Sequence, residues 1–134
     1  MTKTSERSFF FEVEPVPASR PRVTRWGTYY GKRYERFRVA MVQALQFNKS
    51  APISGDLWLE AEFICPPPKK ITRTSPRGDI DNYVKGPLDS MTKHGGFWND
   101  DDQIVHIEAT KRYQKGNEKY GIRIRYGSTD TPAV

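Results

Sequence analysis

The stretch LWLEAEFI, residues 57–64, alternates between two kinds of side chain. Its odd-numbered residues are all apolar, whereas its even-numbered residues are Trp58, Glu60, Glu62 and Ile64. Successive side chains of a β-strand point to opposite faces of a sheet. The pattern therefore predicts a strand with one apolar face and one mixed face.

Breaks on both sides separate this strand from other regular segments. Pro52 to Gly55 precede it, and three prolines at 66–68 end it. Upstream, the patterns predict a strand over residues 9–13, an extended segment over 23–30 bent at Gly27, and an amphipathic helix over 32–49. Downstream, they predict a helix over 81–92 and strands over 105–110 and 120–126.

These elements describe an α+β domain in which two helices pack on one face of a small mixed β-sheet. The turn-rich QKGNEK, residues 114–119, predicts a hairpin between the last two strands. The length of 134 residues suits a single domain over 1–134. Residues 127–134 are expected to form a flexible tail.

Charge points to a partner class. Lys and Arg outnumber Asp and Glu by 22 to 16, and the net charge is +6. This excess favours nucleic acid over acidic metabolites, although a merely soluble basic surface is the alternative. No apolar run approaches the ~18 residues that span a membrane, and the N-terminus lacks an apolar signal core. We therefore expect a cytosolic protein that binds no membrane.

The single cysteine, Cys65, lies at the end of the predicted strand over 57–64 and has no second cysteine to pair with. It is expected to be an ordinary buried thiol.

Two acidic groups are candidates for chemistry. In RGDIDNYVKGPLDS, residues 77–90, Asp79 and Asp81 stand two apart just before the predicted helix. In an extended backbone both carboxylates would point to one side, with Cα atoms about 6–7 Å apart. Mg²⁺ usually takes one or two carboxylates together with substrate phosphate oxygens. A third acid could come from NDDDQ, residues 99–103.

Each acidic group also has a structural interpretation. Asp81 or Asn82 can cap the helix, because a short acceptor there satisfies an unpaired N–H group. The run 100–102 can be a solvated turn. Lys85, four residues after Asp81 and four before Asp89, can be the middle of an ion-pair ladder. On spacing alone, these structural roles are favoured.

Taken together, RGDIDNYVKGPLDSMTKHGGFWNDDDQIVHIEATK, residues 77–111, resembles the core of the RusA-type Holliday junction resolvases. The shared features are an Asp-x-Asp-Asn, a lysine four residues after its second acid, a Phe/Trp, paired acids and a Gln-Ile/Val. PVPASRPRVTRWGTYYGKRYERF, residues 15–37, also resembles that family's N-terminal Pro/Arg segment and first helix. The resemblance covers most of the chain.

The resemblance implies a RusA-like fold and an endodeoxyribonuclease of DNA recombination and repair. Such an enzyme is a homodimer that binds four-way DNA junctions and, with Mg²⁺ or Mn²⁺, cuts two opposing strands symmetrically. By position, Asp79, Asp81 and Asp101 are implied as metal-binding carboxylates, Asp100 as an accessory acid and Lys85 as the catalytic lysine. The lysine could stabilise charge on the phosphoryl group or steady the leaving oxygen. A phage or bacterial source, and hence the bacterial cytoplasm, is implied too.

Basic residues are expected to hold the DNA backbone. They are Arg20, Arg22, Arg25 and Lys32 near the N-terminal segment, and Lys69, Lys70, Arg73 and Arg77 in the loop before Asp79. Solvated basic segments are the alternative. Trp26, Tyr29 and Tyr30 could touch unstacked bases, and at least one of them is expected to pack against the sheet.

One departure from the family pattern lies beside the lysine. Gly86 and Pro87 follow it where the family more often has helix-forming apolar residues, and Pro87 removes the N–H that would bond to Tyr83. A kink or a late helix start is expected. Two other functions therefore stay open: a DNA-binding protein of this fold without resolvase activity, and a nuclease acting on other branched or single-stranded DNA.

Overall fold

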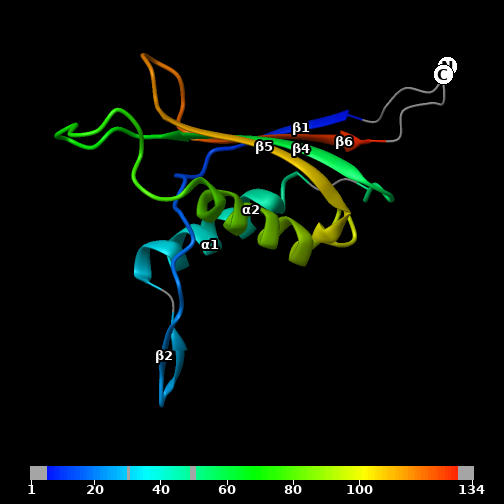
Figure 1. The fold of residues 1–134 in the computed structure, drawn as a ribbon, viewed down its shortest axis with the longest axis horizontal. Coiled ribbons are helices and arrows are strands. Elements are labelled where there is room, and N and C mark those ends of the chain that lie inside the picture. The colour runs from blue at the N-terminus through cyan, green and yellow to red at the C-terminus, as the bar shows by residue number, and fades with distance from the viewer. Residues whose placement is uncertain (1–5, 30, 49–50, 130–134) are drawn as a thin grey trace.

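Four strands form one sheet, and two α-helices cover one of its faces (Figure 1). The computed structural model describes residues 6–29, 31–48 and 51–129. Its elements are β1 (Glu6–Phe11), β2 (Arg22–Thr24), β3 (Gly27–Tyr29), α1 (Lys32–Leu45), β4 (Leu57–Cys65), α2 (Ile80–His94), the 3₁₀ turn η1 (Asp101–Gln103), β5 (Ile104–Tyr113) and β6 (Gly121–Ser128). The predicted α+β class, with a mixed sheet and both helices on one face, is confirmed.

Strand β4 lies inside the sheet, whose order is β1-β6-β4-β5. It pairs in parallel with β5 on one side and antiparallel with β6 on the other. Leu57, Leu59, Ala61 and Phe63 point toward the helices and are at most 5% exposed. The alternation of this strand thus sets the apolar floor of the core.

The prediction of a hairpin between the last two strands is wrong. β5 and β6 do not pair with each other, because each pairs with β4 from the opposite side. The connection between them passes the end of β4, where the Gln114 N–H donates to the Cys65 carbonyl at 2.8 Å. The expected tail also begins too early, since Gly127 and Ser128 belong to β6. Residues 130–134 lie outside the described residues.

The parallel pair β4–β5 requires a crossover, and α2 supplies it. The chain leaves the end of β4, returns along the sheet through α2 and enters β5 at its start. The N-terminus of α2 therefore lies near the end of β4, whereas η1 lies at the opposite end of the domain (Figure 1).

The two helices approach closely at Gly86. A Cβ atom on Gly86 would lie 2.8 Å from Phe37 Cε2 and 3.3 Å from the Tyr34 hydroxyl, both on α1. Glycine is the residue that leaves this space open. α2 begins at Ile80 and continues past the buried Pro87, so the expected late helix start is wrong.

The other face of the sheet carries paired charges. Glu62 on β4 accepts from Arg123 on β6 at 2.8 Å and from Arg112 on β5 at 3.2 Å. Arg112 also binds Glu118 in the loop that follows β5. This hydrogen bond is the main reason why the pKa of Glu118 falls to about 2, and the Lys115 N–H donor lowers it further.

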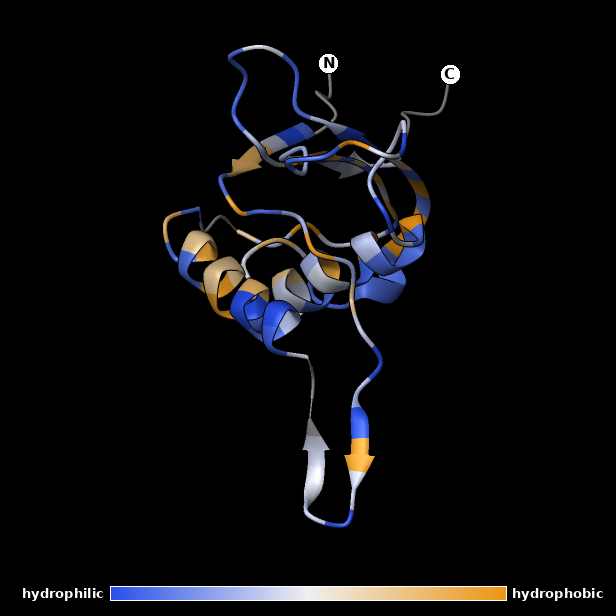
Figure 2. Cartoon of the chain, turned by 90° about the vertical axis from the view of Figure 1, so that its left-hand side faces the viewer, coloured by the Kyte–Doolittle hydropathy of each residue, from blue (hydrophilic) through white to orange (hydrophobic). Residues whose placement is uncertain are grey.

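Residues 22–29 form a separate hairpin and not one bent segment. β2 and β3 pair only with each other, through a turn at Arg25 and Trp26 and a Gly27 with φ of 133°. Figure 2 shows this hairpin as an arm that extends away from the helices and the sheet. Trp26 is 75% exposed, so it does not pack on the sheet; the side chain of Tyr29 and all of Tyr30 lie outside the described residues.

Replacing Gly86 by Ala tests the helix contact. Alanine gains about 1 kcal/mol over glycine in a helix, but overpacking a core typically costs about 1–3 kcal/mol. Phe37 is 3% exposed and stacks on Tyr34, so its ring has little room to move. We expect urea unfolding to show a net loss of up to about 2 kcal/mol. Gly31→Ala is the control, because its nearest atom, Ser19 Oγ, is 3.8 Å away; a more stable Gly86→Ala protein would contradict the contact.

Replacing Glu118 by Gln tests the charge network through pH. The pKa of Glu118 in the folded chain, about 2, is below its ordinary value of 4.5. The carboxylate therefore stabilises the fold above about pH 4.5, and this contribution is lost as the pH falls toward about 2. Urea unfolding between these pH values should give curves for Glu118→Gln and wild type that converge in acid. High salt should shrink the difference, and parallel curves would contradict the assignment.

Candidate active site and nucleic-acid interface

Asp79 and Asp81 lie at the N-terminal end of α2. Asp79 holds the N-cap position with extended backbone angles, φ −76° and ψ 141°, but its side chain makes no capping hydrogen bond. Asp81 belongs to the first helical turn. The expected extended stretch across both residues therefore does not form, since the helix begins between them. Both carboxylates are nevertheless exposed at one end of one helix.

The structural roles that spacing favoured for these residues are not realised. Within the described residues, the carboxylates of Asp79 and Asp81 have no hydrogen-bond or ion-pair partner, and neither has the ammonium group of Lys85. The ion-pair ladder Asp81–Lys85–Asp89 does not form, although the spacing places all three on one helix face. Three charged groups thus remain available to a ligand.

The loop before Asp79 is held by its carbonyl groups. Lys111 on β5 donates through Nζ to the Pro76 carbonyl at 2.7 Å and also to the Gly78 carbonyl. The Tyr83 hydroxyl donates to the Arg77 carbonyl at 2.6 Å. Three consecutive carbonyls are therefore fixed by two side chains of the sheet and the helix, immediately before the first acid.

Packing against Pro17 and Tyr83 holds the same loop in place. Gly78 has φ of 108°, and a Cβ there would lie 2.9 Å from Pro17 Cγ and 3.3 Å from the Tyr83 ring. The Ala18 N–H donates to the Asn82 carbonyl at 2.8 Å, which ties the segment after β1 to the first turn of α2. These contacts hold the backbone of residues 76–82, which carries Asp79 and Asp81; we call this segment the platform.

In the second acidic group, at η1, Asp100 has a structural role and the pKa of Asp101 is raised. Asp100 Oδ1 accepts from the Asp102 N–H at 3.1 Å, and Gln103 completes a reciprocal capping box. Asp100 is therefore a cap, the role that spacing suggested for Asp81 or Asn82 at the start of α2. Loss of hydration, then a hydrogen bond with Asp100 and the negative charges of Asp100, Asp89 and Asp102, raises the pKa of Asp101.

The two acidic groups stand apart in one chain. The negative charge of Asp89 contributes to the raised pKa of Asp101, and Asp89 follows Asp81 by two helical turns, about 12 Å along the axis. The described residues contain no group of three His, Cys, Asp or Glu side chains that could hold a metal ion. The crossover topology explains this result, because it places the start of α2 and the start of β5 at opposite ends. The three carboxylates expected to act together are not brought together.

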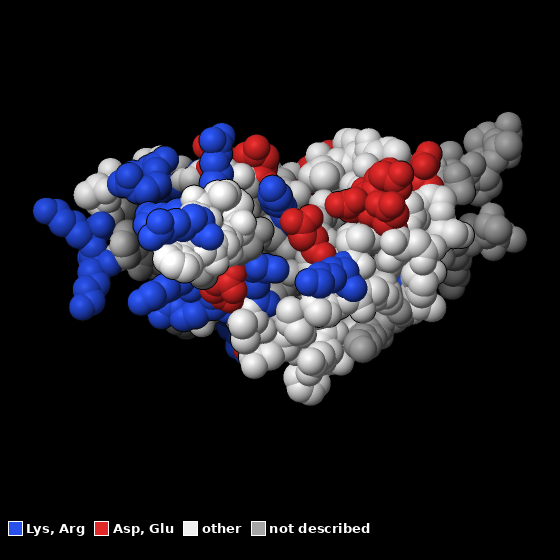
Figure 3. Space-filling view, turned by 90° about the horizontal axis from the view of Figure 1, so that it is seen from below, with Lys and Arg blue, Asp and Glu red and all other residues white. Residues whose placement is uncertain are grey.

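A basic hollow adjoins the first acidic pair. It has a volume of about 550 Å³, and its lining includes Pro76, Tyr83, one acidic side chain, Glu14, and four basic side chains: Arg33, Lys70, Arg73 and Arg77. Figure 3 shows Lys and Arg gathered toward the end that carries the loop before α2 and the arm, and Asp and Glu toward the end that carries η1. The surface is therefore polarised along α2.

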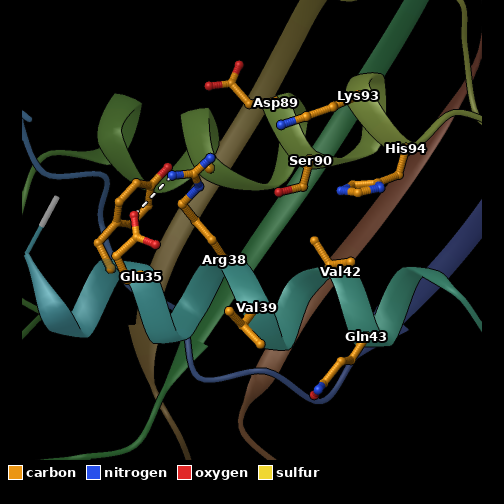
Figure 4. A pocket seen from close by; sticks show the side chains of 11 residues that line it. Glu35, Arg38, Val39, Val42, Gln43, Asp89, Ser90, Lys93 and His94 are labelled. Atoms are coloured by element: carbon orange, nitrogen blue, oxygen red, sulfur yellow. Dashed lines mark hydrogen bonds and ion pairs between the residues drawn. The ribbon is translucent and has the colours of Figure 1, made fainter. Parts of the chain in front are cut away.

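A second hollow, of about 560 Å³, runs between α1 and α2 (Figure 4). Val39 and Val42 line it from α1, and Asp89, Lys93 and His94 line it from α2. None of the residues expected in the active site lines this groove. Gly86 of α2 and Tyr34 of α1, which lie where the two helices approach closely, also line it.

A family model described as endodeoxyribonuclease RusA matches residues 12–125. The chain belongs to the RusA endodeoxyribonuclease family. The match spans both acidic groups, Lys85 and the arm. The uncharacterized protein YqaN of Bacillus subtilis (strain 168) is 28% identical over 122 residues, which cover 76% of this chain and 84% of YqaN. No helix among the described residues is long and apolar enough to cross a membrane.

The basic residues expected to contact DNA are all exposed in this RusA-family chain. They are Arg20, Arg22, Arg25, Lys32, Lys69, Lys70, Arg73 and Arg77. The first four lie along the arm and the start of α1, and the other four lie in the loop between β4 and α2. Both sets stand at the polarised end that also holds Asp79 and Asp81.

Sequence reasoning missed three residues of this RusA-family site. Arg33 lines the basic hollow, and the negative charge of Asp89 contributes to the raised pKa of Asp101. Lys111 shares the helix-facing side of β5 with Ile107 and Ala109. A lysine in phase with apolar residues of a strand is a usable signal, because its charge must find partners within the protein.

Replacing Lys111 by Met tests the platform. It removes the ammonium group but keeps the chain length, and hydrogen bonds to charged groups contribute about 1.5–3 kcal/mol. We expect a loss of about that size in the free energy of unfolding, with faster hydrogen exchange at the Asn82 and Tyr83 amides. These amides donate to the Asp79 carbonyl at 3.1 and 3.2 Å.

Lys115→Met is the matched control, since Lys115 is an exposed loop lysine. Equal effects of the two substitutions on stability and exchange would contradict the role of Lys111.

Proposed function

We propose that this chain is a Mg²⁺-dependent endodeoxyribonuclease that resolves Holliday junctions by paired, symmetric nicks, acting as a homodimer. The observation that carries the proposal is a set of three charges, at the N-cap and in the first turns of α2, that have no partner among the described residues. Asp79, Asp81 and Lys85 share one exposed end of a helix, beside a basic hollow, in a chain of the RusA family.

The donor set of Asp79 and Asp81 fits a hard divalent cation. Both are carboxylates, both are exposed, and neither is used by the protein itself within the described residues. Mg²⁺ needs only one or two carboxylates when substrate phosphate supplies further oxygens. The chemistry that the cation supplies when bound is activation of water and stabilisation of charge on the phosphoryl oxygens. Mn²⁺ fits the same donors.

Asp101 is proposed as the third ligand, with Asp100 beside it as an accessory acid. The separation of Asp101 from the first pair within one chain means that the full set forms only in a larger assembly or after a change on DNA binding. Asp100 keeps its capping role in either case, because its contacts lie within η1.

Lys85 is proposed to act on the phosphate. Its ammonium group lies one turn after Asp81 and has no partner of its own among the described residues. It can stabilise the negative charge on the phosphoryl oxygens or steady the leaving oxygen. The basic hollow and the arm would hold the DNA backbone on either side, through the eight exposed basic residues named above and Arg33.

Substituting Asp81 by Asn tests the proposal. The amide removes a metal-binding charge but preserves shape, so cleavage of a four-way junction should fall by at least about 100-fold while junction binding in EDTA persists. Gel assays of cleavage and of binding measure the two effects separately. Asp56→Asn is the control, an exposed acid at the start of β4.

The η1 acids provide a sharper comparison. Asp101→Asn should impair cleavage, whereas Asp102→Asn in the same turn should not. Asp100→Asn keeps the cap, since Asn caps about as well as Asp. Its effect on cleavage therefore measures the loss of the Asp100 negative charge alone. Undiminished cleavage by Asp81→Asn would refute the proposed site. Equal cleavage of junctions, flaps and duplex at one salt concentration would refute the proposed substrate.

A further inference from the structure

The described residues of the β2–β3 arm lie at the surface, away from the core of the domain. Residues 19–28 are all exposed, and the two strands pair with each other and not with the main sheet. Figures 1 and 2 show the arm projecting beyond both helices. A two-stranded hairpin is at best marginally stable in water, so an arm whose residues 19–28 are all exposed adds little to folding stability. Its sequence is better explained by a partner outside the chain.

The charge of the arm identifies the class of partner. From Pro15 to Tyr34 the sequence contains no Asp or Glu, although it contains Arg20, Arg22, Arg25, Lys32 and Arg33. The only described acid paired with this group is Glu14, whose Oε1 lies 3.9 Å from Arg33 Nη2. A segment of twenty residues with five positive charges and no negative one complements a phosphate backbone.

The tip of the arm carries a large ring. Trp26 stands in the turn between the strands and is 75% exposed, and Val23 on β2 is 78% exposed. The Arg25 guanidinium carbon lies 4.9 Å from the centre of the Trp26 ring. Thr24 shapes the turn, because its hydroxyl donates to the Gly27 carbonyl at 3.2 Å and accepts from the Trp26 N–H at 3.2 Å.

An exposed aromatic ring beside arginines is the arrangement with which proteins bind unpaired bases. Every base has a π-face, so stacking on a ring tolerates any sequence. It selects for structure, because bases inside a continuous duplex already stack on their neighbours. A branch point is where such neighbours are missing.

We propose that the arm reads the branch point of DNA: Trp26 stacks on a base exposed at the branch, while Arg20, Arg22 and Arg25 hold the flanking phosphates. This inference rests on the proposed function, from which it takes branched DNA as the substrate. It adds a contact made by a separate element, so selection of the branch and cutting of the strand depend on different residues.

The test measures binding in EDTA, where cleavage does not contribute. Wild type, Trp26→Ala, Trp26→Phe and Phe47→Ala are compared on a four-way junction and on a linear duplex of equal length at one salt concentration. Phe47 is the matched control, an aromatic residue 87% exposed just after α1. Trp26→Ala should weaken junction binding about 5- to 150-fold, the range for loss of one stacked base, and leave duplex binding unchanged. Trp26→Phe should restore most of the loss.

The phosphate contacts are tested in the same assay. Arg22→Gln should weaken binding to both DNAs and reduce the slope of log affinity against log salt by about 1. Equal binding by Trp26→Ala and wild type, or an equal loss on junction and duplex, would overturn the stacking role. A change in the sedimentation of the free protein caused by Trp26→Ala would also overturn it, since the arm would then contact a second copy of the chain.

The outcome is distinguishable from failure of the proposed function. Junction-selective binding that depends on Trp26, in a protein that cuts no DNA, would support the arm and refute the nuclease. Cleavage that depends on Asp81 but not on Trp26 would support the nuclease and refute the arm. Wild-type protein without preference for the junction would refute both.

Discussion

The parallel pairing of β4 with β5 is the constraint on which the rest of the structure depends. Two consecutive parallel strands cannot be joined by a tight turn, so the chain must return along the sheet. α2 makes that return and covers the core formed by Leu59, Phe63 and their neighbours. The same geometry fixes the two acidic groups at opposite ends of α2. Asp79 and Asp81 face the basic end, and Asp101 belongs to the other.

Two local features keep the first of these ends rigid. Gly86 allows α2 to lie directly against Phe37 and Tyr34 of α1. Lys111 and Tyr83 hold the three carbonyls that precede Asp79. The protein therefore uses partly buried polar contacts to fix the backbone near the acids, while the acids themselves remain exposed. Such a division suits the proposed site, at which the acids would bind a cation and a phosphate from solution.

Much of the fold could be predicted from the sequence, because alternation and helical spacing report directly on burial. The strand over 57–64 agrees closely with β4, and the helix predicted over 32–49 begins where α1 begins but is too long, because α1 ends at Leu45. Strand order could not be predicted, since QKGNEK suits a hairpin and also a connection past the end of β4. The available space around Gly86 was equally hidden, because it depends on which helix packs against α2. Pro87, which suggested a kink or a late helix start, lies within a helix that begins at Ile80.

The candidate site could also be predicted only in part, because spacing along the sequence reports on local neighbours and not on contacts between distant segments. Spacing placed Asp79, Asp81 and Lys85 together, and they are neighbours on α2. Spacing favoured capping there, yet the side chain that caps is Asp100, in η1. Contacts between distant segments, such as those of Lys111 with residues 76–78, depend on tertiary structure. The only sign of them in the sequence is that Lys111 falls on the same face of its strand as apolar residues.

The most direct measurement of the central claim maps the cuts made in a four-way junction whose four strands are labelled in turn, with and without Mg²⁺. The account predicts paired nicks at symmetric positions in two opposing strands, and none in EDTA. Nicks that persist in EDTA, cuts confined to one strand, or an intact junction in the presence of Mg²⁺ would contradict it.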